Sequence, residues 1–417
     1  MNTVDTTLIR QVRLLCPASG QDQITDVRLQ GGQVLEIGDL PTAAQEIDGR
    51  GLWLMPGIID LCARLREPGA TQKASISSEA RAARAAGITT VVMPPDTRPV
   101  ADSAAVVDRI HATALAAQGA RVRVLGALTT GLLGESLGEL AALQKAGVVG
   151  VSNGLAPLAN LLVARRALEY AKGLNLTVHV FALDAALANG GCAHEGAMAS
   201  KLGLPSIPVA AEVAAIRAWI SLVEDTGASI HIGRLSSARA VELVELAKAR
   251  GLPVTADVAA HQLFLTDASL EGFNAQAHVI PPLRSEHDRQ ALRAAVASGV
   301  IDAICSDHQP HEADAKINPF PLTEPGISAL ETLLPLALRL VNEGVLSPLA
   351  MATRLSLGPA RVLGLPPPSV AIDRETALVL VDPSRQWRLE PGQMQSRGHN
   401  SPFAGTTFAG CCVQAFG

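Results

Sequence analysis

Short runs of β-branched residues alternate with amphipathic segments rich in alanine and leucine between about residues 54 and 345, and the alternation occurs eight times. Strands followed by helices in this order predict a parallel sheet, and eight such units predict a closed (β/α)8 barrel. The expected strands cover residues 54–63, 88–94, 121–128, 147–152, 176–183, 229–236, 253–260 and 300–307.

Several of the intervening segments carry the residues that begin and end helices. Serine at an N-cap accepts a hydrogen bond from a free backbone N–H, and glycine adopts the left-handed conformation that ends many helices. We therefore expect helices that begin after a serine and stop at a glycine at 75–87, 103–119 and 237–251, with further helices ending at Gly147, Gly173, Gly227, Gly299 and Gly344.

Residues 1–52 and 366–417 read as short strands separated by turn residues. Two terminal segments of the same type predict one shared β domain beside a barrel of residues 53–365. Pro366, Pro367 and Pro368 mark the second boundary, because a run of prolines cannot continue the preceding helix.

Composition narrows the class of protein. The 417 residues are 48% hydrophobic and 18% charged, which excludes disorder, and only 3% aromatic, so the core must be aliphatic. A net charge of −5 gives no basic footprint for nucleic acid. The N-terminus lacks the pattern of a signal peptide and no long apolar stretch follows, which predicts a cytoplasmic protein without a membrane segment. The six cysteines form no CxxC pair and are expected to be reduced.

The active site of a barrel of this kind lies at the carboxyl ends of its strands. Five of the expected strands carry polar or bulky residues at these ends: Asp60, Cys62 and Arg64, then Ser152 and Asn153, then Phe181, then Arg234, and finally Asp307 and His308.

Seven segments in unbroken order resemble a bacterial dihydroorotase of the amidohydrolase superfamily. They are PGIIDLCARLREPG, GITTVVMPPDTRPV, GGCAHEG, VTADVAAHQLFLTD, the run from IPPLRSEHD to SDHQPHEADAK, GISALETLLPLAL and GHNSPFAGTTFAG. The resemblance covers about residues 50–410. It implies an α/β fold, the TIM-type (β/α)8 amidohydrolase barrel, with a small β-sandwich domain built from both termini.

Active members of that family bind a pair of zinc ions, and the resemblance allows each ligand position to be compared. Cys62 and Arg64 stand where the family has its His-x-His motif, and Asn153 stands where it has the bridging acid. Phe181 and Arg234 stand where it has the two later histidines. Only Asp307 matches. Phenylalanine has no lone pair and guanidinium is a permanent cation without an acceptor, so we expect no zinc, no other cofactor and no hydrolysis by the family's mechanism.

The substrate side is more mixed. Arg66 matches the family's carboxylate-binding arginine, whereas Asp96 and Ile280 stand where the family has asparagines. An aspartate there would repel an anionic dihydroorotate. Arg66 and the family histidines His261, His308 and His311 are therefore interpreted as vestigial.

Catalytically silent dihydroorotases are known that associate with aspartate carbamoyltransferase as the non-catalytic chain of its holoenzyme, and this sequence resembles them. The resemblance predicts a structural subunit of pyrimidine biosynthesis, as a homo-oligomer within a hetero-oligomer with the carbamoyltransferase catalytic chain.

Two alternatives remain open. One is an active amidohydrolase with a rearranged or single-metal site formed by Asp307 with Cys62 or a nearby histidine. The other is a protein that binds a small anion through Arg66.

The sequence also predicts what replaces the metal. Strand 8 lies beside strand 1 in a closed barrel, so Arg64 starts from the strand next to Asp307, and Arg234 enters the same mouth from strand 6. A carboxylate left unpaired there would be costly. We therefore expect an internal ion pair between Asp307 and Arg64, with Arg234 as the second candidate.

Overall fold

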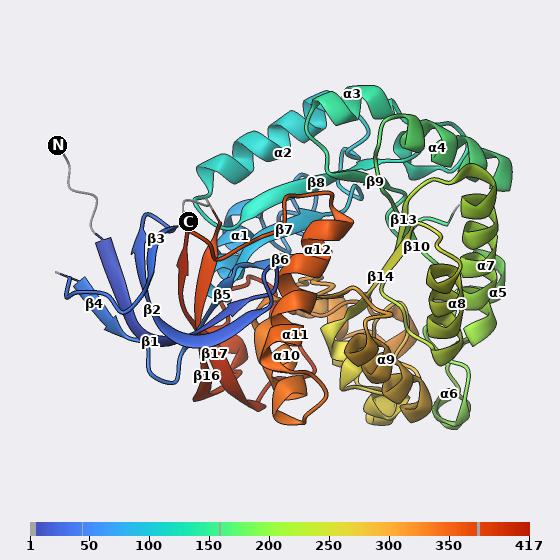
Figure 1. Cartoon of the computed structure of the whole chain (residues 1–417). Coiled ribbons are helices and arrows are strands. Elements are labelled where there is room, and N and C mark those ends of the chain that lie inside the picture. Colours follow the sequence, from blue (N-terminus) through green and yellow to red (C-terminus); the bar gives the residue numbers. More distant parts are fainter. Residues whose placement is uncertain (1–5, 44, 158–159, 373–375) are drawn as a thin grey trace.

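A parallel eight-stranded barrel forms the centre of the computed structural model, which describes residues 6–43, 45–157, 160–372 and 376–417 (Figure 1). The predicted terminal segments thus extend in part outside the described residues. The barrel strands follow one another in chain order: β6 (Ile58–Asp60), β7 (Ile88–Met93), β8 (Arg121–Ala127), β9 (Gly150–Ser152), β10 (Val178–Phe181), β13 (Ile230–Gly233), β14 (Val254–Ala259) and β15 (Ala303–Cys305).

The ring closes between β15 and β6 through residues just beyond the two strands. Ala63 pairs with His308 in a parallel bridge, and the backbone N–H of Arg64 donates to the carbonyl of His308 at 2.9 Å. All eight expected strands are present, which confirms the predicted barrel.

Helices surround the barrel. Those that alternate with the barrel strands along the chain are α1 (Ile76–Ala85), α2 (Ala104–Ala116), α3 (Leu140–Lys145), α4 (Leu161–Gly173), α7 (Val209–Thr226), α8 (Ala238–Ala249), α9 (Glu286–Ser298) and α10 (Leu330–Asn342). Shorter elements are α5 (Ala185–Ala188), β11 (Ala193–His194), α6 (Ala197–Leu202), β12 (Ser206–Ile207), α11 (Pro348–Ala352) and α12 (Gly358–Val362). Short 3₁₀ segments lie at Thr130–Leu132, Ala260–Leu263, Asp267–Phe273, Ala275–Ala277, Ala313–Lys316, Phe320–Leu322 and Pro391–Gln393, and a π-helical segment, Thr353–Leu357, joins α11 to α12.

The predicted helix ends agree with the structure at most positions. Ser75 and Ser237 are N-caps whose side chains accept from the N–H groups of Ser78 and Ala240. Gly227 ends α7 in the left-handed conformation, with φ of 66°. Gly173 differs, because it is the last residue of α4 and the left-handed residue is Asn175, with φ of 54°. Asparagine tolerates that conformation better than most side chains.

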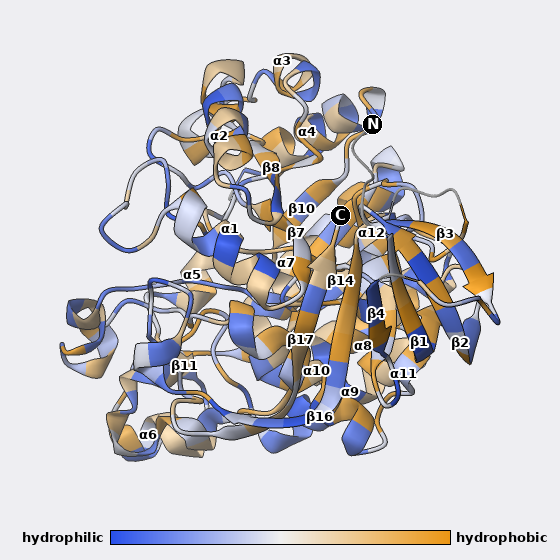
Figure 2. Ribbon diagram, turned by 90° about the vertical axis from the view of Figure 1, so that its left-hand side faces the viewer, coloured by the Kyte–Doolittle hydropathy of each residue, from blue (hydrophilic) through white to orange (hydrophobic). Residues whose placement is uncertain are grey.

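A second sheet joins the two ends of the chain. Its strands are β1 (Thr6–Cys16), β2 (Gln21–Gln30), β3 (Gln33–Gly38), β4 (Gln45–Asp48), β5 (Trp53–Pro56), β16 (Leu378–Arg388) and β17 (Thr407–Phe416). β5 lies between β1 and β16, so N-terminal and C-terminal strands share one sheet. The second half of β2 alternates buried and partly exposed residues, as expected of a strand with one buried face, whereas β1 carries adjacent buried residues such as Leu14 and Leu15 and is covered on both faces (Figure 2). The expected β domain built from both termini is confirmed.

The first expected barrel strand is divided between the two sheets. Trp53–Pro56 pairs in the terminal sheet as β5, and the chain enters the barrel as β6 only after Gly57. A Cβ atom on Gly57 would lie 2.2 Å from the side-chain oxygen of Thr89. Glycine is therefore needed where the chain crosses between sheets, and the continuous apolar run conceals that crossing.

The core is aliphatic, as the composition predicts. Side chains such as Ile58, Val91, Val124, Val178 and Ile232 belong to one buried cluster that fills the barrel and the layer beneath its helices. All six cysteines are free thiols among the described residues. No helix in those residues is long and apolar enough to cross a membrane.

Candidate functional site at the barrel mouth

Three residues that come shortly after barrel strands have an uncommon backbone conformation. Arg66, Arg234 and Asp307 follow β6, β13 and β15 with positive φ of 65°, 60° and 47°. Positive φ is rare for residues other than glycine, and such residues gather at functional sites. The chain thus turns sharply at the mouth, where the sequence places the chemistry.

Asp307 is the centre of a buried polar cluster, with only 1% of its surface exposed. Its Oδ1 accepts from Nη1 of Arg234 at 3.3 Å and lies 3.6 Å from Nη1 of Arg64. Gln309 donates to both carboxylate oxygens at 3.3 Å, and Sγ of Cys62 lies 3.6 Å from Oδ1. The expected internal ion pair is therefore present.

Arg64 and Arg234 differ from the expectation in which carboxylate each contacts more closely. Arg64 was expected to be the main partner of Asp307, but its Nε donates to Asp96 at the shorter distance of 2.8 Å. Its Nη2 is buried and has no hydrogen-bond partner among the described residues. The guanidinium lies between two carboxylates, and Arg234 is the closer cation to Asp307.

Phe181 supports Arg234. The guanidinium carbon of Arg234 lies 4.5 Å from the centre of the Phe181 ring, a cation–π contact. Residues at two positions where the family resemblance expects zinc ligands thus contact each other. The backbone N–H of Arg234 also donates to Oδ1 of Asp257 at 2.6 Å, which fixes the turn after β13.

Asn153 has a structural role. Its carbonyl oxygen accepts from the hydroxyl of Thr129 at 2.6 Å, and its amide donates to the carbonyls of Leu132 and Ala156. These contacts tie the loop after β9 to the loop after β8. In the part of the chain that the structure describes, Asn153 makes no contact with Asp307.

The family histidines do not meet at one point. The Nδ1 atom of His308 accepts from the N–H of Ala329 and its Nε2 donates to Glu79 at 2.8 Å, so the ring is used in holding α1. Nε2 of His311 lies 3.1 Å from Arg66 and Nδ1 lies 3.0 Å from Lys73. His261 is buried, which lowers its pKa to about 4, and its Nδ1 has no hydrogen-bond partner among the described residues.

One buried group at this end of the barrel was not predicted. Asp257 on β14 accepts from Nε2 of His231 at 2.9 Å, and Nδ1 of His231 lies 3.0 Å from the hydroxyl of Thr255. The ring of His179 packs 5.1 Å from that of His231, and burial lowers the pKa of His179 to about 3. A signal was present in the sequence, because polar residues at matching positions of three apolar strands indicate an inward-facing row.

The mouth opens into a cavity of about 350 Å³ lined by Arg64, Arg66, Lys73, Asp96, Arg98, Glu312 and Glu324, among others. Arg66 donates to the carbonyl of Pro310 at 3.0 Å, and burial, together with the charge of Arg64, lowers its pKa to about 10. Lys73 pairs with Glu324 at 2.5 Å. Two of these cations, Arg64 and Lys73, are thus paired with acids of the same cavity, Asp96 and Glu324.

The residues of this cluster do not suit a zinc pair. Guanidinium groups contribute positive charge and no lone pair. Burial raises the pKa of the Cys62 thiol to about 12, which opposes the thiolate form that metals bind. Within the described ranges, no group of three or more His, Cys, Asp or Glu side chains is arranged to hold a metal ion.

The profile of the dihydro-orotase-like family matches residues 51–240. A dihydroorotase-like protein of Pseudomonas aeruginosa is 49% identical over 405 residues, 96% of either chain. A dihydroorotase of Anaeromyxobacter dehalogenans is 40% identical over 414 residues, 98% of this chain and 96% of its own. The structure of L-hydantoinase from Arthrobacter aurescens covers 98% of this chain and 94% of its own at 23% identity with a TM-score of 0.86, which shows a shared fold.

Proposed function

The chain belongs to the dihydroorotase-like amidohydrolase family, and from that premise we propose that it is a catalytically inactive member that serves as a structural subunit of an aspartate carbamoyltransferase holoenzyme. The observation that carries the proposal is the buried cluster at the barrel mouth. Arg64 and Arg234 direct two guanidinium groups at Asp307, the one family ligand that remains.

The cluster explains why hydrolysis by the family's route is not expected. Opening a cyclic amide needs an activated water and a group that polarises the carbonyl oxygen. Asp307 is engaged by the guanidinium groups of Arg234 and Arg64 and by the Gln309 amide, so its carboxylate oxygens are taken up within the cluster. Both ring nitrogens of His308 and of His311 are engaged by neighbouring groups, and burial lowers the pKa of His261 to about 4, which makes each a poor replacement for it as a base.

The retained fold supports a structural role. The barrel is closed, its helices keep their caps, and the terminal sheet is complete across β17 to β3. The framework is kept while ion pairs fill the barrel mouth, which supports a function in binding a partner through the protein surface. Silent dihydroorotases that bind aspartate carbamoyltransferase provide the precedent for the partner.

A second candidate is an active amidohydrolase with a rearranged or single-metal site. It is favoured by the 40% identity to a protein named dihydroorotase and by the approach of Cys62 to Asp307 at 3.6 Å. A thiol and a carboxylate supply two ligands, fewer than the three protein ligands of a typical catalytic zinc site. The neighbouring guanidinium groups oppose a cation there.

Metal content distinguishes these candidates. We expect the purified protein, after dialysis, to hold zinc well below one ion per chain by elemental analysis. Cys62→His should show no dihydroorotase turnover, because Phe181, Arg64 and Arg234 still fill the site. Tightly held stoichiometric zinc, or turnover in that variant, would favour the active enzyme.

The partner is tested by isolation from the native cell. A tagged chain should retain an aspartate carbamoyltransferase catalytic chain in fixed stoichiometry, and the complex should be symmetric, as most soluble assemblies are. Deletion of the chain should reduce carbamoyltransferase assembly or activity while dihydroorotase activity persists from another polypeptide. A carbamoyltransferase of unchanged size and activity in the deletion strain rules out the structural role.

A further inference from the structure

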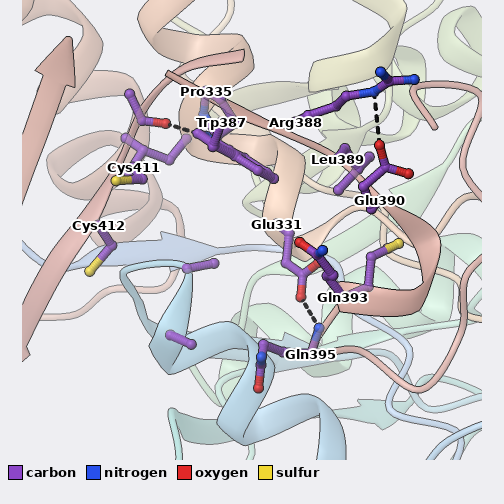
Figure 3. A pocket seen from close by; sticks show the side chains of 15 residues that line it. Glu331, Pro335, Trp387, Arg388, Leu389, Glu390, Gln393, Gln395, Cys411 and Cys412 are labelled. Carbon is purple, nitrogen blue, oxygen red and sulfur yellow. Dashed lines mark hydrogen bonds and ion pairs between the residues drawn. The ribbon is translucent and has the colours of Figure 1, made fainter. Parts of the chain in front are cut away.

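A separate pocket of about 220 Å³ lies where α1 and α10 meet the C-terminal hairpin of β16 and β17 (Figure 3). Its walls are mostly apolar and include Leu334, Pro335, Trp387, Leu389 and Met394. None of these residues belongs to the cluster at the barrel mouth. The pocket is therefore a distinct site.

Trp387 forms a fixed aromatic wall. Its indole N–H donates to the carbonyl of Gly410 at 2.9 Å, and its ring packs 5.5 Å from that of Phe408. The indole extends toward Glu331 in the pocket (Figure 3). Tryptophan presents the most favourable ring face for a cation.

Glu331 brings a carboxylate without a counter-cation into this apolar setting. Its Oε1 accepts from the backbone N–H groups of Gln395 and Ser396. No lysine, arginine or histidine of the described residues forms an ion pair with it, and the charge that acts on it is that of Glu79, which repels. Burial raises the pKa of Glu331, as expected for an acid that lacks a partner.

The other charged side chains of the pocket do not supply that partner. Arg388 pairs with Glu390 at 2.8 Å instead. Glu331 is half-buried, so its carboxylate keeps part of its hydration and would attract a cation that enters the pocket. Two backbone donors reach one oxygen of Glu331, which leaves the second oxygen for an external donor.

Pro335 provides a further acceptor nearby. It lies inside α10 and lacks the N–H that would bond to the carbonyl oxygen four residues earlier, which is that of Glu331. Both residues line the pocket. The Glu331 carbonyl therefore lacks its usual helical donor, in the same turn that carries the Glu331 carboxylate.

We propose that this pocket binds a small primary ammonium compound with an aryl or branched aliphatic body. The ammonium group bonds to Glu331 and the body packs on Trp387, Leu334 and Leu389. The carboxylate excludes an anion of the same shape, and the apolar walls give no partners to a strongly hydrated inorganic cation.

The probe is 2-phenylethylamine, titrated into the full-length protein by isothermal calorimetry at low ionic strength. Binding with a Kd of roughly 1 mM or tighter is expected for a ligand of this size. The neutral analogue 2-phenylethanol should bind roughly 10- to 100-fold more weakly, because it lacks the charge-assisted bond.

Glu331→Gln should weaken 2-phenylethylamine by the same factor, since its amide oxygen can still accept from Gln395 and Ser396 while the charge is gone. Glu390→Gln is the matched control, because Glu390 lines the same pocket but pairs with Arg388, and it should change the Kd by less than about twofold. Ala85→Phe places a ring at an exposed wall position and should abolish binding without disturbing the core.

Absence of binding at millimolar 2-phenylethylamine overturns the proposal. So does equal binding by the Glu331→Gln variant, or binding that survives the Ala85→Phe block. Circular dichroism and the melting temperature of each variant confirm that a loss of binding does not come from unfolding.

Discussion

Replacing Asp307 with alanine is expected to lower the free energy of unfolding by about 3–5 kcal/mol, because it leaves buried arginines without their carboxylate. Arg64 and Arg234 are 4% and 8% exposed, and Asp307 is 1% exposed, so water cannot replace the lost partner. Asp96 still neutralises Arg64, which places the main cost on Arg234. Urea denaturation at neutral pH measures the change.

Two further variants separate the loss of charge pairing from the loss of volume. Removing the whole cluster, as Asp307→Ala with Arg64→Met and Arg234→Met, should recover much of the stability, because apolar side chains often replace a buried ionic group at little cost. Asp225→Ala, which breaks an exposed pair with Arg165, should change stability little. If Asp307→Ala is no more destabilising than Asp225→Ala, the cluster does not hold the barrel mouth.

The same variant bears on function. In a working amidohydrolase, loss of this aspartate would chiefly cost activity, whereas here the expected cost is in folding. A variant that stays stable and loses a measurable hydrolase activity would favour the second candidate function.

The barrel could be predicted from local patterns. Each strand is a short apolar run, each helix has an amphipathic repeat, and Ser75 and Ser237 cap helices through contacts within a few residues. Such features depend on near neighbours in the chain, which a sequence displays directly. Gly227 and Gly299 end helices for the same local reason.

Features that depend on closure of the fold were harder to predict. The crossing at Gly57 follows from its approach to Thr89, 32 positions along, and nothing local separates β5 from β6. Arg64 contacts Asp96 because the loop after β7 brings that carboxylate to the barrel mouth. A long side chain has several acceptors within reach, and only the assembled barrel selects among them.

The sequence predicts which residues lie at the barrel mouth, but only in part which of them contact each other. The sequence was enough to show that Phe181, Arg64 and Arg234 cannot be zinc ligands, since that follows from side-chain chemistry. The cation–π contact of Phe181 and the link from Asp257 to His231 depend on strand register.

Glu79 should be the second large contributor to stability, because its buried carboxylate joins three parts of the chain. It accepts from Nε2 of His308 at 2.8 Å, from the hydroxyl of Ser396 at 2.6 Å and from the backbone N–H of Arg397 at 3.0 Å. These contacts hold α1 to the end of β15 and to the segment between β16 and β17. Glu79→Gln removes the charge and turns an amide N–H₂ toward donors, so we expect a strongly destabilised fold.

The pH dependence identifies the carboxylate as the cause. Burial alone would raise the pKa of Glu79, but the bonds from His308, Ser396 and Arg397 lower it to about 2, and a shift from 4.5 to about 2 corresponds to about 3 kcal/mol of stability. Because the folded pKa is depressed, this stability is present in full above the unfolded value and is lost as pH falls from about 5 toward 2.

Urea denaturation of wild type and Glu79→Gln should therefore differ by about 3 kcal/mol at pH 7.5 and by less than half of that at pH 3. Glu286→Gln is the control, because the pKa of Glu286 is also lowered to about 2, by Arg289 and Gln290, but its side chain is 60% exposed and solvent screens the interaction. That variant should differ little from wild type at either pH. If the stability difference between wild type and Glu79→Gln stays constant from pH 7.5 to pH 3, the loss comes from packing. A carboxylate whose pKa is lower in the folded than in the unfolded chain contributes less stability as the pH falls, so the difference must then shrink.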